Sequence, residues 1–347
     1  MKVCYFGIYS KRYPRNNILI QGLEANGVEV IECNSRAKGF KKYWELYSKY
    51  KKIKEHDVVV VGFLGQGIMP WAKLICKKKI IFDAFVSLYN TNVFDRKRYS
   101  QSSLKAKFDY FRDKISCQLA DVVLLDTQAH IDYFVKTFNL PKDKFKKIYA
   151  GADNKYFYPK EKKDSKFIVH FHGYLVPFHG IEYVIEAANI LKNEYIKWQI
   201  VTRFTSRYEK IKQKVESQGL QNVVFHNEVS QEELNTLINN ADICLGVFGN
   251  TPKKDLVIPN KIFESLACKK PLITSESTAT KEILENAENV LFCKTADPQD
   301  LADKVMKLKD NPDLRNKIAA SGHELYQQRF QPKILGQELV NIIKQTI

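Results

Sequence analysis

Residues 258–273 contain two features that could bind a ligand. One is a helix start that suits an anion, and the other is a single carboxylate one turn later. Pro259 leads into a short amphipathic helix, in which Asn260 is expected as the N-cap and Glu264 follows about one turn later. The unpaired amides of a helix N-terminus suit a phosphate, and a carboxylate beside them can accept two hydrogen bonds from a vicinal diol such as a ribose. The same pattern also fits a surface helix with an ordinary exposed glutamate.

Charge is unevenly distributed along the chain, whose formal net charge is +16. Residues 1–155 hold 29 Lys and Arg against 15 Asp and Glu, whereas the remaining residues hold 26 against 24. A strongly cationic first half indicates an anionic binding partner, such as a membrane surface, a polyanionic substrate or nucleic acid. Because no recognised nucleic-acid-binding module is found, we rank nucleic acid last and expect no such partner.

Cysteine usage and hydropathy exclude several protein classes. The seven cysteines are scattered, without a C-x-x-C pair or histidines at metal-ligand spacing, which argues against a disulfide framework and against a metal site. No apolar run approaches the ~20 residues that cross a bilayer, and the first residues are typical of a strand, not of a signal peptide. We expect a cytoplasmic protein, peripheral at the inner face of the membrane.

Strands and helices alternate twice along the chain. Continuous apolar strands, such as residues 58–64, are separated by amphipathic helices, which is typical of a parallel sheet covered on both faces. A polar segment at residues 156–165 divides the two series. We therefore predict an α/β fold of two doubly wound, Rossmann-like domains, residues 1–155 and 156–330, facing across a cleft. Ligands are expected at the carboxyl ends of the strands.

Five motifs follow one another in the order found in a known enzyme family. They are a G-A-D…F-x-P segment, a glycine-bounded loop, a V-x-F-H…V-S-x-E-E-L segment, an A-D-I tripeptide and the helix after Pro259. Together they resemble glycosyltransferase family 4, whose members have the GT-B fold. The motifs lie at residues 151–159, 173–181, 223–234, 241–243 and 259–267.

The resemblance implies a retaining, metal-independent glycosyltransferase that needs no cofactor. Such an enzyme moves a hexose from a nucleotide-sugar donor, UDP- or GDP-linked, to a glycan or lipid-linked acceptor. The second domain holds most of the donor and the first holds the acceptor. We expect a role in cell-surface polysaccharide or glycoconjugate assembly. The resemblance also implies that a C-terminal helix in residues 331–347 crosses back to the first domain.

The expected donor site departs from the family's pattern. The arginine and lysine that usually frame its phosphate loop are Tyr174 and His179 here, and the acid expected eight residues before Glu264 is Leu256. We expect Glu264 to bind the ribose, and Lys261 and Arg203 to replace the missing cations, although both also fit ordinary surface positions. A protonated His179 could donate to phosphate, or it could simply be solvated. The expected donor-binding residues are Glu264, Lys261, Asn260, Arg203, Tyr174, His179 and Gly180.

Two polar residues in the first half are candidates for catalysis. Asp83 and Ser87 follow an apolar strand and are expected to face the cleft, where Asp83 could orient the acceptor hydroxyl or the sugar. An aspartate that merely caps a loop is about equally compatible with the pattern. The basic loop at residues 10–17, with Arg12 and Arg15, could contact a phosphate or could only precede the first helix.

An aromatic stripe suggests where a membrane could bind. On a helix, aromatic side chains between residues 40 and 50 share one face and are flanked by lysines, which is typical of an interfacial helix. The stripe could equally pack on the sheet. It comprises Phe40, Tyr43, Trp44, Tyr47 and Tyr50.

Other functions remain open from the sequence. An epimerase or a phosphorylase can share the two-domain architecture. Leu256, Tyr174 and His179 also fit a catalytically degenerate subunit that binds a nucleotide or a partner without turnover.

Overall fold

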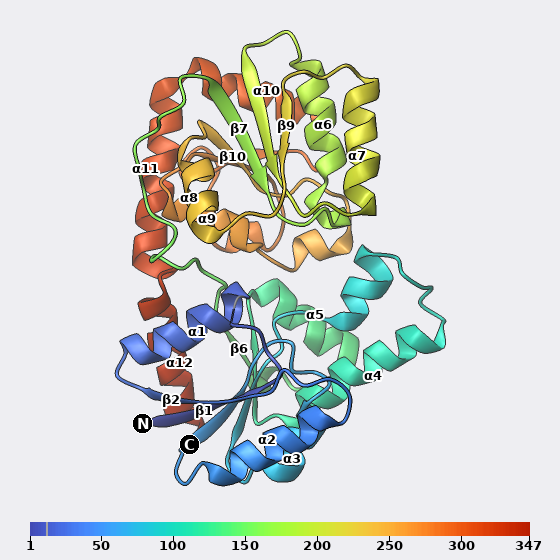
Figure 1. The fold of residues 1–347 in the computed structure, drawn as a ribbon, viewed down its shortest axis with the longest axis vertical. Helices are drawn as coiled ribbons and strands as arrows, with labels where there is room; N and C mark the ends of the chain where they lie inside the picture. Colours follow the sequence, from blue (N-terminus) through green and yellow to red (C-terminus); the bar gives the residue numbers. More distant parts are fainter. Residues whose placement is uncertain (12) are drawn as a thin grey trace. The chain divides into compact units, whose positions relative to one another are not determined.

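The computed structural model describes residues 1–11 and 13–347, so Arg12 of the predicted basic loop lies outside the described residues. The chain divides into two compact units, drawn in Figure 1. Unit 1 comprises residues 1–151 and 330–347, and unit 2 comprises residues 152–329. The boundary predicted from the sequence falls after residue 155, whereas this division places it after residue 151.

Unit 1 contains a six-stranded parallel sheet in the order β2-β1-β3-β4-β5-β6. Short β-branched and aromatic runs form its central strands, which are buried on both faces. The strands are β1 (Lys2–Gly7), β2 (Glu29–Asn34), β3 (Val58–Val61), β4 (Ile80–Asp83), β5 (Val122–Leu125) and β6 (Phe145–Lys147).

Helices cover both faces of this sheet (Figure 1). One face packs against α1 (Pro14–Ala25) and α12 (Pro332–Thr346), whereas the other forms a core with α2–α5. Gly22 and Gly336 let α1 and α12 approach closely, because a Cβ on Gly22 would lie 2.8 Å from the Cα of Gly336. The C-terminal helix thus belongs to unit 1. The other helices are α2 (Lys41–Lys52), α3 (Met69–Ile75), α4 (Leu104–Leu119), α5 (Gln128–Phe138), the π-helix η1 (Asn90–Asp95) and the 3-10 helix η2 (Lys142–Lys144).

Unit 2 contains a second six-stranded parallel sheet, in the order β12-β11-β10-β7-β8-β9. The strand order reverses between β7 and β10, which is the point where ligands bind in open α/β sheets. The strands are β7 (Phe167–His172), β8 (Ile196–Val201), β9 (Val223–His226), β10 (Ile243–Leu245), β11 (Leu272–Ser275) and β12 (Leu291–Cys293).

The helices of unit 2 also lie on both faces of its sheet. The main core lies between the sheet and the helices α6, α7 and α10, whereas α9 packs against α11. The helices are η3 (Pro177–His179), α6 (Ile181–Ile190), α7 (Ser206–Ser217), α8 (Gln231–Asn239), η4 (Pro252–Asp255), α9 (Asn260–Ala267), η5 (Thr280–Glu282), α10 (Pro298–Asp310) and α11 (Pro312–Arg329).

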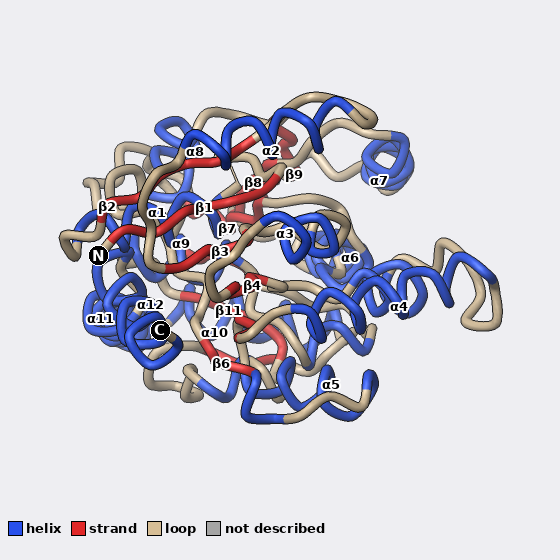
Figure 2. Tube along the Cα trace, turned by 90° about the horizontal axis from the view of Figure 1, so that it is seen from below, coloured by secondary structure: helices blue, strands red, loops and turns tan. Residues whose placement is uncertain are grey.

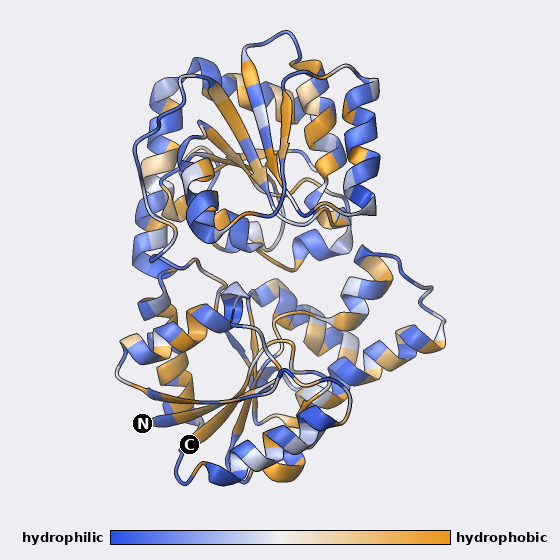
Figure 3. Ribbon diagram, viewed as in Figure 1, coloured by the Kyte–Doolittle hydropathy of each residue, from blue (hydrophilic) through white to orange (hydrophobic). Residues whose placement is uncertain are grey.

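Hydropathy follows this arrangement, with largely apolar strands and mixed helix surfaces (Figure 3). The aromatic stripe predicted around α2 is divided: Tyr43 and Tyr50 pack against the core, whereas Phe40 and Trp44 are 89% and 71% exposed. Within the described residues, no helix is both long enough and apolar enough to span a bilayer.

Candidate functional site

The N-terminus of α9 lies beside the reversal of strand order in unit 2. Pro259 is its N-cap residue and makes no side-chain capping bond, so the prediction that Asn260 is the N-cap is wrong. Asn260 is instead the first helical residue and is partly buried. Without a capping side chain, the first amides of α9 keep their capacity to bind an anion.

Glu264 lies one turn into α9 and is 7% exposed. Its Oε2 accepts a hydrogen bond from Nε2 of His172 at 2.7 Å, across 92 positions of sequence. Within the described residues, no hydrogen bond to Oε1 is present. One carboxylate oxygen is therefore held by the protein while the other is available to a ligand.

A chain of hydrogen bonds continues behind Glu264. Nδ1 of His172 lies 3.0 Å from Nε2 of His170, and Nδ1 of His170 lies 2.8 Å from the side-chain amide nitrogen of Gln199. That amide also donates to the backbone oxygen of Leu237 at 3.2 Å. Because the amide nitrogen can only donate, His170 accepts at Nδ1 and donates from Nε2. His172 in turn accepts at Nδ1 and donates to the carboxylate of Glu264.

His170 and His172 are site residues that were not predicted from the sequence. They alternate with the core residues Val169 and Phe171 along β7, so both histidines face away from the main core. Two histidines two positions apart at the carboxyl end of a strand, just before Gly173, were the available signal. Burial lowers the pKa of His170 well below its ordinary value, and the neighbouring His172 and Lys261 lower it further.

Lys261 lies at the first turn of α9 and is 3% exposed. Its Nζ has no hydrogen-bond partner among the described residues and lies 3.7 Å from the centroid of the Phe171 ring. Burial lowers the pKa of Lys261 well below the usual lysine value, and Glu264 only partly opposes this shift. An anion bound at Nζ would supply the missing partner and favour the charged form.

The loop between β7 and α6 closes around this lysine. A Cβ on Gly173, whose φ is +123°, would lie 3.3 Å from Nζ of Lys261 and 3.4 Å from Cε1 of His179. His179 is buried and its Nδ1 donates to the backbone oxygen of Tyr174 at 2.6 Å. Burial lowers the pKa of His179 well below its ordinary value, and Lys261 lowers it further. Burial thus disfavours the protonated form of His179, and its Nδ1 is already engaged by Tyr174, so these contacts do not support the predicted role as a protonated phosphate donor.

Gly180 places this loop against the loop after β10. Gly180 has φ of +67°, and a Cβ there would lie 2.4 Å from the backbone nitrogen of Gly249. Two backbone hydrogen bonds join the loops, from Phe248 to His179 and from Gly249 to Phe178, both at 3.1 Å. Gly180 is therefore required by close backbone approach.

Arg203 and Tyr174 lie in a more exposed group. The hydroxyl of Tyr174 donates to Glu228 at 3.4 Å, and Nε of Arg203 lies 3.9 Å from the other carboxylate oxygen. The side chains of Arg203 and Glu228 are 62% and 57% exposed. Arg203 is thus solvated at the carboxyl end of β8, without the burial that distinguishes Lys261.

Position 256, where the family resemblance implies an acid, is occupied by leucine. Leu256 packs with Phe178 and Val257 in a small hydrophobic cluster. The adjacent Asp255 accepts hydrogen bonds from Lys254 at 3.0 Å and from the backbone of Thr278 at 3.3 Å. Asp255 is therefore already engaged by neighbouring residues.

In unit 1, Asp83 is fully buried and paired with Arg15. Nε of Arg15 lies 3.1 Å and 3.0 Å from the two carboxylate oxygens, and Nη2 donates at 2.9 Å. Nη1 donates to the backbone oxygens of Ile148 and Tyr149. Although burial alone would lower the pKa of Arg15, the Asp83 carboxylate raises it above its ordinary value. This geometry contradicts an exposed acceptor-orienting Asp83 and a phosphate-binding Arg15.

Ser87 is also buried and engaged. Its hydroxyl donates to Asp113 at 2.8 Å and accepts from the backbone nitrogen of Asn90 at 2.9 Å. Burial raises the pKa of Asp113 to about 7, against the hydrogen bonds from Tyr89 and Ser87 that lower it. The contacts assign Ser87 to the packing of α4, and they do not support its predicted catalytic role.

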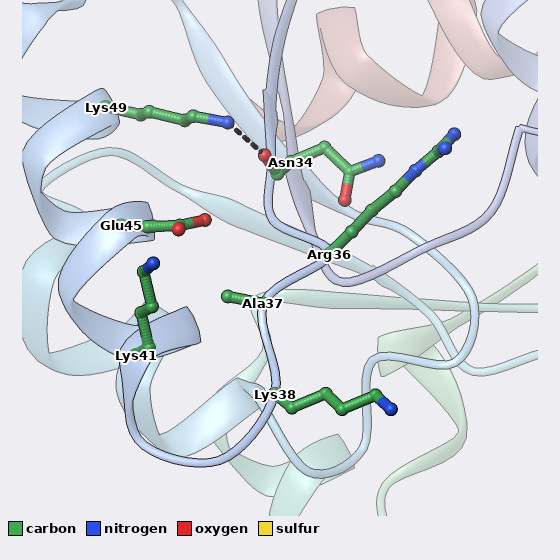
Figure 4. A pocket seen from close by; sticks show the side chains of 7 residues that line it. All are labelled: Asn34, Arg36, Ala37, Lys38, Lys41, Glu45 and Lys49. Carbon is green, nitrogen blue, oxygen red and sulfur yellow. Dashed lines mark hydrogen bonds between the residues drawn. The ribbon is translucent and has the colours of Figure 1, made fainter.

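Unit 1 also has a basic pocket of about 580 Å³ at the carboxyl end of β2. Figure 4 shows Lys41, Glu45 and Lys49 of α2 facing the loop that carries Arg36 and Lys38. Nζ of Lys49 donates to the backbone oxygen of Asn34 at 2.7 Å. The pocket is open, so its charges are screened by water and suit only weak binding of an anion.

Known proteins resemble this chain along most of its length. Residues 153–325 match the family model described as glycosyl transferases group 1. A protein named as an uncharacterized glycosyltransferase of Methanocaldococcus jannaschii is 23% identical over 331 residues, 88% of this chain and 79% of that protein. A probable sucrose-phosphate synthase of Thermosipho melanesiensis is 26% identical over 247 residues, 67% of this chain and 56% of that protein.

Solved structures share the fold. A sucrose-phosphate synthase from Thermosynechococcus elongatus has a TM-score of 0.80 at 14% identity, covering 99% of this chain and 98% of that one. Anabaena HepE in complex with UDP-glucose has a TM-score of 0.75 at 15% identity, covering 99% and 100%. The chain is therefore a glycosyltransferase of the two-domain GT-B type, and residues 153–325 form its group 1 glycosyl transferase domain.

Proposed function

We propose that the protein is a retaining, metal-independent hexosyltransferase. It moves a hexose from a UDP- or GDP-linked donor to a glycan or lipid-linked acceptor in the assembly of a cell-surface polysaccharide or glycoconjugate. The main support for the proposed donor site is the buried Nζ of Lys261. This atom has no hydrogen-bond partner among the described residues, and Lys261 lies on the same helix as Glu264.

The geometry of α9 supports a nucleotide diphosphate at this place. Oε1 of Glu264 would accept hydrogen bonds from the ribose hydroxyls, while His172 holds the other oxygen. The diphosphate would contact the first amides of α9 and Nζ of Lys261. HepE, a neighbour in fold, was solved with UDP-glucose.

Charge neutralisation is the chemistry that these groups can supply. When the bond between the anomeric carbon and the diphosphate breaks, negative charge grows on the leaving oxygen. Lys261 and the helix amides would stabilise that charge from fixed positions in a site shielded from water. His179 donates within its own loop and burial disfavours its charged form, so we assign it no part in charge neutralisation.

The acceptor side of the proposal depends on unit 1. Its basic surface, including the pocket of Figure 4, suits an acceptor with phosphate groups, such as a lipid-linked sugar. We place the enzyme in the cytoplasm, peripheral at the inner face of the membrane. Since Asp83 and Ser87 are buried and engaged, neither is included in the proposed catalytic machinery.

A catalytically degenerate subunit is the second candidate. Leu256 in its apolar cluster is the observation that favours it, because the family resemblance implies an acid at that position. Such a subunit would bind a nucleotide through Glu264 and Lys261 without transferring a sugar.

Thermal stabilisation by UDP, GDP, ADP and CMP tests the donor site. A ligand at ~100 times its dissociation constant adds roughly 2.7 kcal/mol to native-state stability. We expect a shift with UDP or GDP that is lost in Glu264→Gln and kept in Glu209→Gln, a control on the exposed face of α7. A shift with neither nucleotide, or one that survives in Glu264→Gln, would refute the site.

Turnover distinguishes the two candidates. The nucleotide sugar of the preferred nucleotide is incubated with the protein and a membrane extract, with and without EDTA. Release of nucleotide and transfer of sugar in both samples supports the metal-independent enzyme. Nucleotide binding without release supports the degenerate subunit.

A further inference from the structure

Helix α4 exposes an apolar stripe that the described residues leave largely uncovered. Leu104 is 82% exposed, Phe108 63%, Phe111 54% and Ile115 43%. At 3.6 residues per turn, their spacing places them within a band about 60° wide on one face of the helix. The hydroxyl of Ser103 caps the helix by accepting from the amide of Ala106 at 3.2 Å, so the stripe lies on a regular helix.

The charged residues of α4 are sorted by sign. Its acids, Asp109 and Asp113, are 6% and 1% exposed and point into the protein, where they accept hydrogen bonds from Asn92 and Ser87. The remaining charges are basic and surround the stripe. By helical spacing, Lys105 and Arg112 lie on one side of it, and Lys107 and Lys114 lie on the other.

Exposed basic and apolar residues also occur next to α4. Arg96, Lys97 and Arg98 are exposed in the segment that precedes the helix. The helix α3 packs beside α4 and exposes Leu74 to 75%. In both views of the chain, α4 and the loop before it lie at the periphery of unit 1 (Figures 1 and 2).

We propose that this face of α4 is the surface by which the enzyme docks on an anionic lipid bilayer. The apolar side chains enter the boundary between headgroups and acyl chains, and the flanking lysines and arginine contact the headgroup phosphates. This inference rests on the peripheral attachment proposed above and assigns it to α4 in place of the α2 stripe. It does not depend on the donor site in unit 2.

Charge complementarity favours a membrane over a second copy of the chain. Two α4 faces brought together would place basic rows against basic rows, with no exposed acid on the helix to compensate. An anionic bilayer instead supplies negative charge on both sides of the stripe. The guanidinium of Arg112 lies 5.4 Å from the centroid of the Phe108 ring, so charge and apolar surface meet at one place.

Vesicle flotation of the full-length protein tests the assignment. The vesicles contain phosphatidylcholine alone or an equimolar mixture with phosphatidylglycerol. One variant carries Leu104→Gln, Phe108→Gln, Phe111→Gln and Ile115→Gln, which keeps helix propensity. A second carries Lys105→Gln, Lys107→Gln, Arg112→Gln and Lys114→Gln. The matched control, Phe40→Gln with Trp44→Gln, removes the exposed aromatic residues of α2.

We expect the wild type and the α2 control to bind anionic vesicles. The apolar α4 variant should bind at least about tenfold more weakly than the wild type. The basic variant should bind about fivefold more weakly for each charge removed, and this loss should be smaller in high salt. Circular dichroism and the nucleotide-induced thermal shift should remain unchanged in all variants. Retention of both signals shows that weaker vesicle binding is not caused by unfolding.

Other outcomes would overturn the inference in distinguishable ways. If the wild type binds vesicles and the α4 variants bind equally well, attachment stands but α4 is not its surface. Loss of binding in the α2 control alone would assign docking to α2. If the wild type does not bind vesicles, peripheral attachment fails as well, while the donor site is judged by nucleotide binding alone. A dimer in light scattering that the apolar α4 variant dissolves would identify a contact between copies.

Discussion

His172 and Glu264 lie 92 positions apart in the sequence, yet their side chains meet at 2.7 Å in unit 2. His172 ends β7, and Glu264 lies on α9, which is positioned next to the reversal of strand order. The orientation of the carboxylate therefore depends on an imidazole that is itself held by His170 and Gln199. This dependence gives His172 a positioning role that can be measured.

Replacing His172 with phenylalanine should weaken nucleotide binding by about tenfold, because a hydrogen bond to a charged group contributes about 1.5–3 kcal/mol. Glu264→Gln should weaken it further, and the double variant should lose little more than Glu264→Gln alone. Calorimetric titration of each variant with the preferred nucleotide measures this coupling. His323→Gln on α11 is the control. Additive losses would show that the two residues act independently.

The alternation of apolar strands and amphipathic helices predicted two parallel sheets, because that pattern is a local property of the chain. The helix that begins after Pro259 was also predictable, since Pro259, Lys261 and Glu264 lie within a few positions. The pairing of His172 with Glu264 was not predicted, because partners so far apart are brought together only by tertiary packing. The period-two pattern of His170 and His172 was a usable signal.

The same reason explains the errors in unit 1. Asp83 at a strand end fits a site residue from the sequence alone, but its partner Arg15 is 68 positions away. On α4, the sequence does not show which apolar residues face the core. Cys117 is buried whereas Phe111 is 54% exposed. Burial is decided by neighbouring elements, so local periodicity cannot assign it.

Lys261→Met should make the free protein more stable and abolish nucleotide binding. The variant removes a buried amine without a partner, whose burial costs about 1–3 kcal/mol. An unfolded lysine binds its proton below about pH 10.4, whereas burial lowers the pKa in the native state. The wild type should therefore lose stability as pH falls below about 10, and the variant should lose less.

Thermal denaturation at several pH values, with and without nucleotide, measures both effects. Lys269→Met, at an exposed position just after α9, is the control and should change neither stability nor binding. If Lys261→Met is less stable than the wild type, Nζ of Lys261 has a stabilising interaction in the free protein, which would contradict its lack of a hydrogen-bond partner.

Breaking the Arg15–Asp83 pair should lower the free energy of unfolding of unit 1 without changing the donor site. Asp83→Asn or Arg15→Met alone should cost about 3–5 kcal/mol, because each leaves a buried charge unpaired. Urea denaturation measures the loss, and the nucleotide-induced shift of unit 2 should persist. Asp132→Asn breaks the exposed pair with Lys142 and should cost under about 1 kcal/mol. A stable Asp83→Asn protein without transferase activity would restore Asp83 as a catalytic candidate.

Asp113 should make stability depend on pH near neutrality. Burial raises its pKa to about 7, so the native carboxyl keeps its proton where the unfolded one, with a pKa near 3.9, has lost it. Stability should therefore fall as pH rises from about 4 to about 7, by about 2–4 kcal/mol. In Asp113→Asn this fall should disappear, whereas it should persist in Asp143→Asn at an exposed position. Parallel urea-denaturation profiles of the wild type and Asp113→Asn would refute the shifted pKa.

Gly180 and Gly219 provide a matched test of the contact between the loops after β7 and β10. Their φ angles are +67° and +65°, so alanine should suffer similar backbone strain of about 1 kcal/mol at both positions. Only at Gly180 would the new Cβ collide with backbone, 2.4 Å from the nitrogen of Gly249; at Gly219 nothing described lies within 4 Å.

Gly180→Ala should therefore cost about 1–3 kcal/mol more than Gly219→Ala in thermal denaturation. It should also weaken nucleotide binding, because the displaced loop carries His179 and Gly173, which surround Lys261. Gly219→Ala should leave binding intact, since Gly219 lies beyond the C-terminus of α7. Equal costs at the two positions would mean that the loops can separate freely, and the closed surroundings of Lys261 would then not depend on their contact.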